Sequence, residues 1–142
     1  MRLSPNVPTG AHRRLVEHYG PSVRGWLGQV ETTIATVAAQ FGTVIDGFHD
    51  AGWTSVVAVA HRGDGQAVIL KAFVEPDRYH QERSALAHWN GRGTCRLLDN
   101  DDTNLVLMTA MVGGAPGGAP RPSDDTERVA DALSRLHEAS RV

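Results

Sequence analysis

Lys71 is the residue whose type and setting most suggest chemistry, because it is the only lysine in the chain. It lies inside an apolar, largely β-branched stretch over residues 67–74, and every other basic residue apart from the histidines is an arginine. A lone ammonium is costly to bury, so it needs either a partner or a function. Lysine offers a compact point charge where arginine offers a wide planar fork, and a compact cation at the end of an apolar strand suits contact with a phosphate. The stretch alone leaves open the alternative that Lys71 snorkels at an exposed strand edge.

Two other groups of residues could be mistaken for sites. The segment His-Arg-Gly-Asp at residues 61–64 resembles an H-x-D catalytic loop, but its place between two expected strands makes Asp64 an exposed turn residue. Four histidines lack the spacing to cysteine or carboxylates that a metal site needs, so we interpret them as surface or packing residues. They are His49, His80, His88 and His137.

The single cysteine, Cys95, excludes an internal disulfide and fits the reducing cytoplasm, where we expect the protein to be. Lone cysteines are usually small core residues, and we expect that here. Asp99, Asp101 and Asp102 form an acidic segment that we interpret as a solvated hairpin turn, with a cation site as the less favoured alternative.

Composition limits the classes of protein and partner. With 142 residues and 15.3 kDa, the sequence is one domain or a piece of a larger one. A net charge of −2 gives no electrostatic footprint for nucleic acid or for an anionic membrane. No apolar run reaches the roughly 20 residues of a membrane span, and the N-terminus lacks the apolar core of a secretory signal.

Hydrophobic periodicity predicts the elements around Lys71. We expect a short helix over residues 11–19, then an amphipathic helix capped by Ser22 and stopped by Gly42. Alternating and short apolar runs predict three strands joined by tight turns, at residues 43–46, 56–60 and 67–74.

A helix opened by Pro76 follows, with Tyr79, Leu86 and Trp89 on one face and an end at Asn90-Gly91. Two more strands, at residues 95–98 and 105–111, flank the acidic turn. A Gly/Pro-rich linker at 113–122 then leads to a last amphipathic helix.

The fold class is therefore α+β, with a five-stranded antiparallel sheet and a helix inserted after strand three. We divide the chain into an N-terminal helical extension (1–42), the sheet unit (43–112), and a linker with the first helix of a further lobe (113–142).

This layout and three motifs resemble the protein-kinase-like small lobe of the aminoglycoside and hydroxyurea antibiotic kinases, of which the streptomycin 6-kinase group is the nearest match. The motifs are Ala-Val-Ile-Leu-Lys at 67–71, the segment Gln-Glu-Arg-Ser-Ala-Leu-Ala-His-Trp-Asn-Gly at 81–91, and Cys-Arg-Leu-Leu at 95–98. The Leu136-His137 pair also recurs in that family. The resemblance covers about residues 30–142.

By this resemblance Lys71 holds the α- and β-phosphates of ATP, and Glu82 is the helix carboxylate that fixes its ammonium. Glu75 is the rival partner, but it lies at the strand end and we expect it to face solvent. The resemblance also makes the segment from Gly47 to Ser55 the loop over the phosphates. Gly47 and Gly52 would allow close approach of the backbone, and Thr54 and Ser55 would donate to phosphate oxygens.

The loop lacks the G-x-G-x-x-G form, and an ordinary hairpin stays the alternative. The resemblance further implies that residues 105–111 lead to a hinge that binds adenine through the backbone, near Thr109 and Met111. Here the sequence departs from the family, which usually has a Glu-Arg pair followed by Leu-x-Pro-Gly.

The implied activity is ATP-dependent phosphoryl transfer to an alcohol group of a small molecule, an aminoglycoside such as streptomycin. The implied cofactors are ATP and Mg²⁺. No catalytic loop or Mg²⁺-binding motif follows Lys71, so we expect an N-terminal lobe that is inactive alone, with those residues in a large lobe. The alternative is a non-catalytic module, derived from a kinase lobe, that binds nucleotide or a protein partner. An exposed apolar lobe face would favour self-association.

Overall fold

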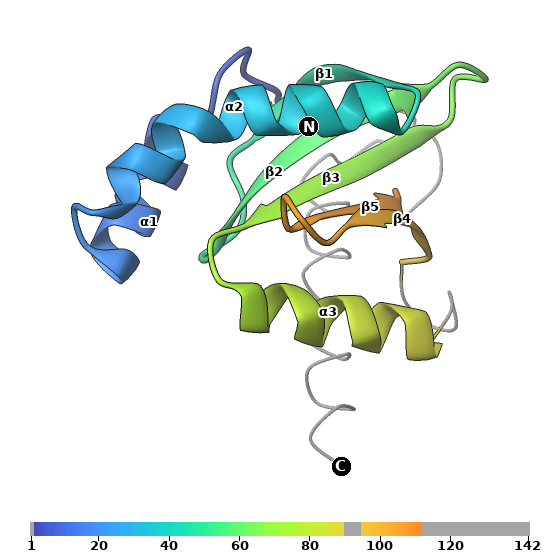
Figure 1. Ribbon diagram of the computed structural model, residues 1–142. Helices are drawn as coiled ribbons and strands as arrows, with labels where there is room; N and C mark the ends of the chain where they lie inside the picture. The colour runs from blue at the N-terminus through green and yellow to red at the C-terminus, as the bar shows by residue number, and fades with distance from the viewer. Residues whose placement is uncertain (1, 90–94, 112–142) are drawn as a thin grey trace.

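An antiparallel sheet of five strands forms the centre of the molecule (Figure 1), and the computed structural model describes residues 2–89 and 95–111. The strands are β1 (Thr43–His49), β2 (Ser55–Arg62), β3 (Ala67–Phe73), β4 (Leu97–Asp101) and β5 (Val106–Ala110). They lie in the order β1-β2-β3-β5-β4, and every neighbouring pair is antiparallel. The predicted fold class, with a helix after strand three, is confirmed.

Three helices accompany the sheet: α1 (Thr9–Tyr19), α2 (Val23–Gln40) and α3 (Pro76–Trp89). In α2 the buried residues recur at steps of three and four, which is why this stretch becomes a helix with one apolar face. Gly42 ends the turn after α2 at a φ of 69°, as predicted for a glycine stop. The predicted Ser22 cap is wrong, because Ser22 has helical backbone angles and its side chain makes no capping hydrogen bond.

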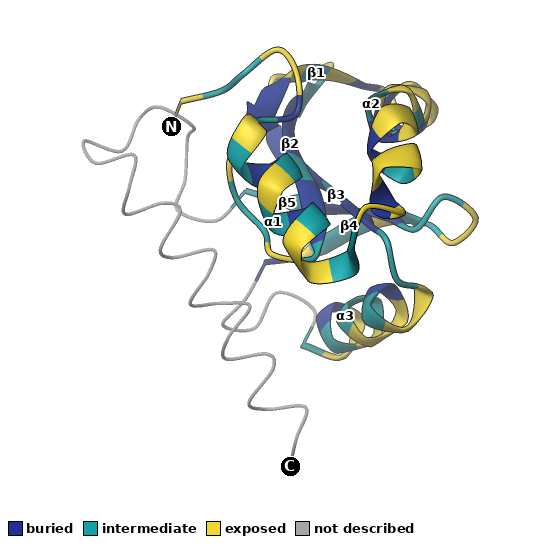
Figure 2. Cartoon of the chain, turned by 90° about the vertical axis from the view of Figure 1, so that its left-hand side faces the viewer, coloured by how far each residue is buried: buried dark blue, intermediate teal, exposed yellow. Residues whose placement is uncertain are grey.

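The two faces of the sheet carry different helices (Figures 1 and 2), and this sets the position of Lys71. Alternate residues of β3, Val68, Leu70 and Ala72, belong to a core that α1 and α2 cover. Lys71 and Phe73 point to the opposite face, since successive side chains of a strand alternate. There α3 supplies Tyr79 and Leu86 to a second, smaller core that includes Phe73.

The loop between β1 and β2 is shorter than predicted. Gly47 lies within β1 and Ser55 begins β2, so only residues 50–54 connect the two strands. A Cβ at Gly47 would lie 2.7 Å from Cβ of Leu3, and so this glycine accommodates the N-terminal segment. Ser4 pairs with the neighbouring Phe48 through two backbone hydrogen bonds, of 2.9 and 2.7 Å.

The predicted turn at Asp99–Asp102 is also wrong. Asp99 and Asp101 lie in β4, which pairs with β5, and the turn follows them, ending at Leu105 with a φ of 57°. The aspartates of this region accept local hydrogen bonds, such as those from the Thr103 and Asn104 amides to Asp101 Oδ1. A polar sequence of this kind favours a turn, yet its first half forms an edge strand.

Some predictions lie outside the described residues: the Asn90-Gly91 helix end, the linker at 113–122 and the last helix. The division of the chain at residues 42 and 112 stays a prediction. Among the described helices, none combines the length and the apolar character needed to cross a bilayer.

Candidate functional site

Lys71 and Glu82 form an ion pair on the α3 side of the sheet. Lys71 Nζ donates to Glu82 Oε1 at 2.8 Å, and the two side chains are 18% and 19% exposed. In the sheet, Lys71 lies opposite Val57 of β2 and Leu107 of β5, so an apolar residue flanks it on each side. The contact expected between these two residues is therefore present, and the alternative of a lysine that snorkels at a free edge is wrong, because β3 has a strand on both sides.

The helix α3 carries Glu82 to the sheet because Glu82 lies on the inner face of the helix. It comes three residues after Tyr79 and four before Leu86, which are 0% and 1% exposed. Tyr79 is held in turn by a 2.6 Å hydrogen bond from its hydroxyl to Asp102 Oδ1, which ties α3 to the end of β4. Burial, followed by this contact, raises the pKa of Tyr79 to about 12.

The Lys71–Glu82 pair lies beside an aromatic ring, and one oxygen of its carboxylate has no hydrogen-bond partner among the described residues. Lys71 Nζ lies 5.1 Å from the centre of the Phe73 ring, a cation–π contact. Burial raises the pKa of the Cys95 thiol, and the Glu82 charge adds to this rise while Lys71 opposes it. Cys95 is thus the buried core residue that was predicted. Glu82 Oε2 is buried and has no hydrogen-bond partner among the described residues, so this carboxylate can accept one further donor.

Glu75, the rival carboxylate, does not contact Lys71. It accepts a hydrogen bond of 3.2 Å from Arg78 and lies beside the Tyr19 hydroxyl of α1. That hydroxyl influences Glu75 most strongly and lowers the pKa of its carboxyl. Tyr19 and Glu75 are close neighbours, although their geometry falls short of a hydrogen bond.

The loop over residues 50–54 closes one end of the β1–β2 hairpin near this face. Gly52 has a φ of 88°, and a Cβ there would lie 2.9 Å from both the carbonyl oxygen and the hydroxyl of Ser55, so this position requires glycine. Ser55 is 1% exposed and pairs with Phe73, which places it on the Lys71 face, and Thr54 precedes it in the loop. A role of Gly52, Thr54 and Ser55 toward phosphate stays a prediction.

Sequence reasoning missed Arg14, which holds this loop from α1. Its Nε donates to the Gly52 carbonyl oxygen at 3.1 Å, and its Nη2 forms an ion pair with Asp50. The helix itself was predicted, but nothing in the sequence connects an arginine of α1 with a loop 38 residues away.

Thr109 and Met111 lie at the far end of β5 from this loop. Thr109 pairs with Ile69 of β3, and Ile69 pairs with Val59 of β2, so these side chains form the next row on the Lys71 face. The Met111 amide donates to the Ala67 carbonyl oxygen at 3.4 Å. Their assignment to an adenine site stays a prediction.

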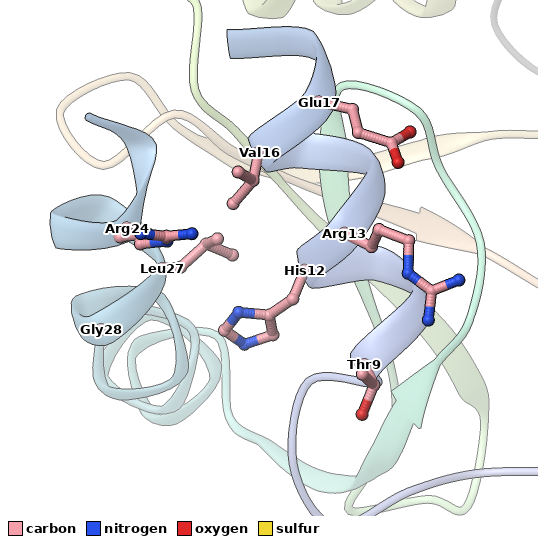
Figure 3. A pocket seen from close by; sticks show the side chains of 8 residues that line it. All are labelled: Thr9, His12, Arg13, Val16, Glu17, Arg24, Leu27 and Gly28. Carbon is pink, nitrogen blue, oxygen red and sulfur yellow. The ribbon is translucent and has the colours of Figure 1, made fainter. Parts of the chain in front are cut away.

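A cavity of about 530 Å³ lies elsewhere, between α1 and α2 (Figure 3), where the side chains of His12, Val16 and Leu27 point into the space between the helices. It includes neither Lys71 nor Glu82 and belongs to the opposite side of the sheet. Within residues 2–89 and 95–111, no group of three His, Cys, Asp or Glu side chains could hold a metal ion. Asp64 Oδ1 accepts a hydrogen bond of 2.8 Å from the Gln66 amide, as is typical of a turn residue.

Comparison with known proteins agrees with this arrangement. The family model described as aminoglycoside/hydroxyurea antibiotic resistance kinase matches residues 41–141. The streptomycin 6-kinase of Streptomyces griseus is 26% identical over 134 residues, which are 93% of this chain and 44% of that protein. The streptomycin 6-kinase of Streptomyces glaucescens is 24% identical over 120 residues, 83% of this chain and 39% of that protein.

The chain thus spans less than half the length of these two relatives. No solved structure matches. The family model covers most of the chain, and the described sheet with α3 has the form of a kinase-like small lobe. The chain therefore belongs to the aminoglycoside/hydroxyurea antibiotic resistance kinase family.

Proposed function

We propose that the chain provides the nucleotide-binding lobe of an ATP-dependent phosphotransferase, whose acceptor is an alcohol group of a small-molecule antibiotic. The observation that carries this proposal is the ion pair between Lys71 and Glu82, on the face of the sheet opposite to α1 and α2. In kinases a strand lysine paired with a helix glutamate must be in place for phosphoryl transfer.

Lys71 would contact the phosphates through its ammonium. The Glu82 carboxylate limits the rotation of the long lysine side chain, so less conformational freedom is lost when a phosphate binds. The flanking Val57 and Leu107 exclude water from the stem of the lysine, which strengthens its attraction to an anion. ATP itself supplies the phosphoryl group when it is bound.

The adenine ring would lie beside the row formed by Val59, Ile69 and Thr109, since a flat apolar base packs on β-branched side chains. Backbone groups near Met111 would bind its polar edge. Mg²⁺ accompanies ATP in such reactions, and no group of three or more His, Cys, Asp or Glu side chains that could hold a metal ion lies among the described residues. We expect its ligands and the catalytic base in a large lobe, outside those residues.

The acceptor is inferred from the relatives alone. Both are named streptomycin 6-kinase, so an aminoglycoside hydroxyl is the acceptor that we propose for the whole protein. The chain would then take part in aminoglycoside resistance.

The direct test is ATP binding by the 142-residue chain, measured by calorimetric titration. We expect Lys71→Met to weaken ATP binding by about tenfold or more, the value of one charge-assisted hydrogen bond. Arg62→Ala is the matched control, because it removes a partly buried cation at the end of β2 far from the loop over residues 50–54 and should leave the affinity unchanged.

A second measurement uses the fact that Lys71 is the only lysine. An acyl-phosphate derivative of ATP should acylate Lys71, and excess ATP should prevent this, as read by mass spectrometry of a single peptide. If wild-type protein binds ATP and Lys71→Met binds it equally well, the assignment of Lys71 is wrong. If the chain binds no nucleotide, the alternative of a partner-binding module gains support.

A further inference from the structure

The loop over residues 50–54 is held from one side by a single residue of α1. The Arg14 guanidinium donates to the Gly52 carbonyl, pairs with Asp50, and lies 5.8 Å from the centre of the Trp53 ring. It thus contacts three residues of the loop, Asp50, Gly52 and Trp53. The Arg14 side chain is only 23% exposed, so these contacts are made in a largely enclosed position.

The start of α1 is shaped to receive Asp50. A Cβ at Gly10, in the first turn of the helix, would lie 2.7 Å from Asp50 Oδ2 and 3.1 Å from Oδ1. A side chain at position 10 would displace this carboxylate, which the positive end of the helix favours. Asp50 therefore pairs with Arg14 and lies against the first turn of α1.

The far end of α1 reaches the helix that carries Glu82. Tyr19 lies beside Glu75, which directly precedes α3, and close to Thr54 at the end of the loop. Burial and the neighbouring Glu75 raise the pKa of Tyr19 to about 12. One helix thus contacts both the loop that precedes β2 and the residue that precedes α3.

The Gly52 carbonyl has a consequence for the backbone amide that follows it. No peptide bond in the described chain is cis, and in a planar trans peptide the C=O and the next N–H point in opposite directions. Because Arg14 draws the Gly52 carbonyl toward α1, the Trp53 N–H points away from α1. The contact with Arg14 thus fixes the orientation of the Gly52–Trp53 peptide plane.

We propose that α1 positions the loop for phosphate binding, with Arg14 as a positioning residue that acts through Asp50 and Gly52. This rests on the proposed function, because it assumes that the loop meets the phosphates of a nucleotide. The family model begins at residue 41, so α1 lies before the matched region and its role does not follow from that match.

The experiment compares ATP with adenosine on the full chain. Arg14→Ala should weaken ATP binding by about tenfold, as expected for the loss of one charge-assisted hydrogen bond, and should leave adenosine binding unchanged. A general loosening of the fold would weaken both ligands alike. Arg13→Ala is the matched control, since Arg13 is an exposed neighbour on α1 that lines the separate cavity (Figure 3) and should behave as wild type.

Two further variants keep the test independent of folding. Arg14→Lys keeps the charge but loses the fork that reaches Asp50 and Gly52 together, so it should restore only part of the ATP affinity. Gly10→Ala should raise the helix propensity of α1 while displacing the Asp50 carboxylate, so it should weaken ATP binding without unfolding the chain.

Hydrogen exchange of the free protein gives the structural readout. In Arg14→Ala the amides of residues 50–54 should exchange about tenfold faster, because the guanidinium no longer holds the loop closed, while those of β3 should not change. If wild type binds ATP and Arg14→Ala binds it equally, the positioning role is refuted while the proposed function stands. If wild type binds adenosine and ATP with the same affinity, the phosphate contact fails and both are refuted.

Discussion

The pair of Lys71 and Glu82 allows a quantitative prediction of its coupling energy. At 2.8 Å and an effective dielectric constant of about 20, two unit charges attract by roughly 6 kcal/mol. The desolvation of two side chains that are about four-fifths buried cancels much of this. We therefore expect a net coupling of about 2 kcal/mol, between the values for exposed pairs and for fully buried ones.

The test is a double-mutant cycle with Lys71→Met and Glu82→Leu, followed by urea unfolding. Each single variant leaves one largely buried charge without its partner and should lower the free energy of unfolding by about 2 kcal/mol. The double variant replaces both charges by apolar groups and should lie within about 1–2 kcal/mol of wild type.

A matched control comes from the contact of His61 with Asp46, which has the same N···O distance of 2.8 Å but side chains that are 42% and 39% exposed. The same cycle there should give less than about 1 kcal/mol. If the two single effects at Lys71 and Glu82 add within about 0.5 kcal/mol, the residues are not coupled in solution and the reasoning about the site is wrong.

Three other predictions concern stability and reactivity. Both tyrosines of the chain, Tyr19 and Tyr79, have a pKa raised from 10.0 to about 12. The folded state therefore holds these protons longer than the unfolded state, so stability should be complete below pH 10 and fall between pH 10 and 12. Tyrosinate absorbance that rises with a midpoint near pH 10 in folded protein would contradict this. Gly52→Ala, with a φ of 88° and contacts of 2.9 Å, should destabilise more than Gly65→Ala, which has a φ of 87° and open space. Gly65→Ala should lower the free energy of unfolding by about 1 kcal/mol, and Gly63→Ala should leave it almost unchanged. Equal urea midpoints for all three variants would count against the loop geometry. The Cys95 thiol, 3% exposed and with its pKa raised by burial, should react with a thiol reagent only after unfolding, and immediate labelling of the native chain would exclude a core position.

Local patterns were sufficient for most of the fold. The apolar stretch around Lys71 predicted β3, and Tyr79 and Leu86 predicted one face of α3. The resemblance to the kinase family, and not the local pattern, singled out Glu82 as the partner of Lys71. The acidic segment at Asp99–Asp102 misled the prediction because turn-forming residues can also occupy an edge strand, where one side faces solvent.

Contacts between distant segments could not be predicted in this way. The glycine at position 47 suggested a ligand loop, yet the backbone there makes room for Leu3. The link from Arg14 to Gly52 depends on how α1 packs beside the sheet, which no local pattern specifies. The contacts that hold the loop over residues 50–54 were therefore not predicted, while the pairing of Lys71 with Glu82 was.

The core shared by α1, α2 and the sheet limits how far the chain can be truncated at its N-terminus. A chain that starts at residue 41, where the family match begins, would lack the apolar residues of α1 and α2 and would expose Val68, Leu70 and Ala72 to water. It would also leave Phe48 at a bare strand edge, since Ser4 would be gone. Such a trimmed protein should precipitate on expression, and grafts of this lobe onto another kinase should carry the first forty residues with it.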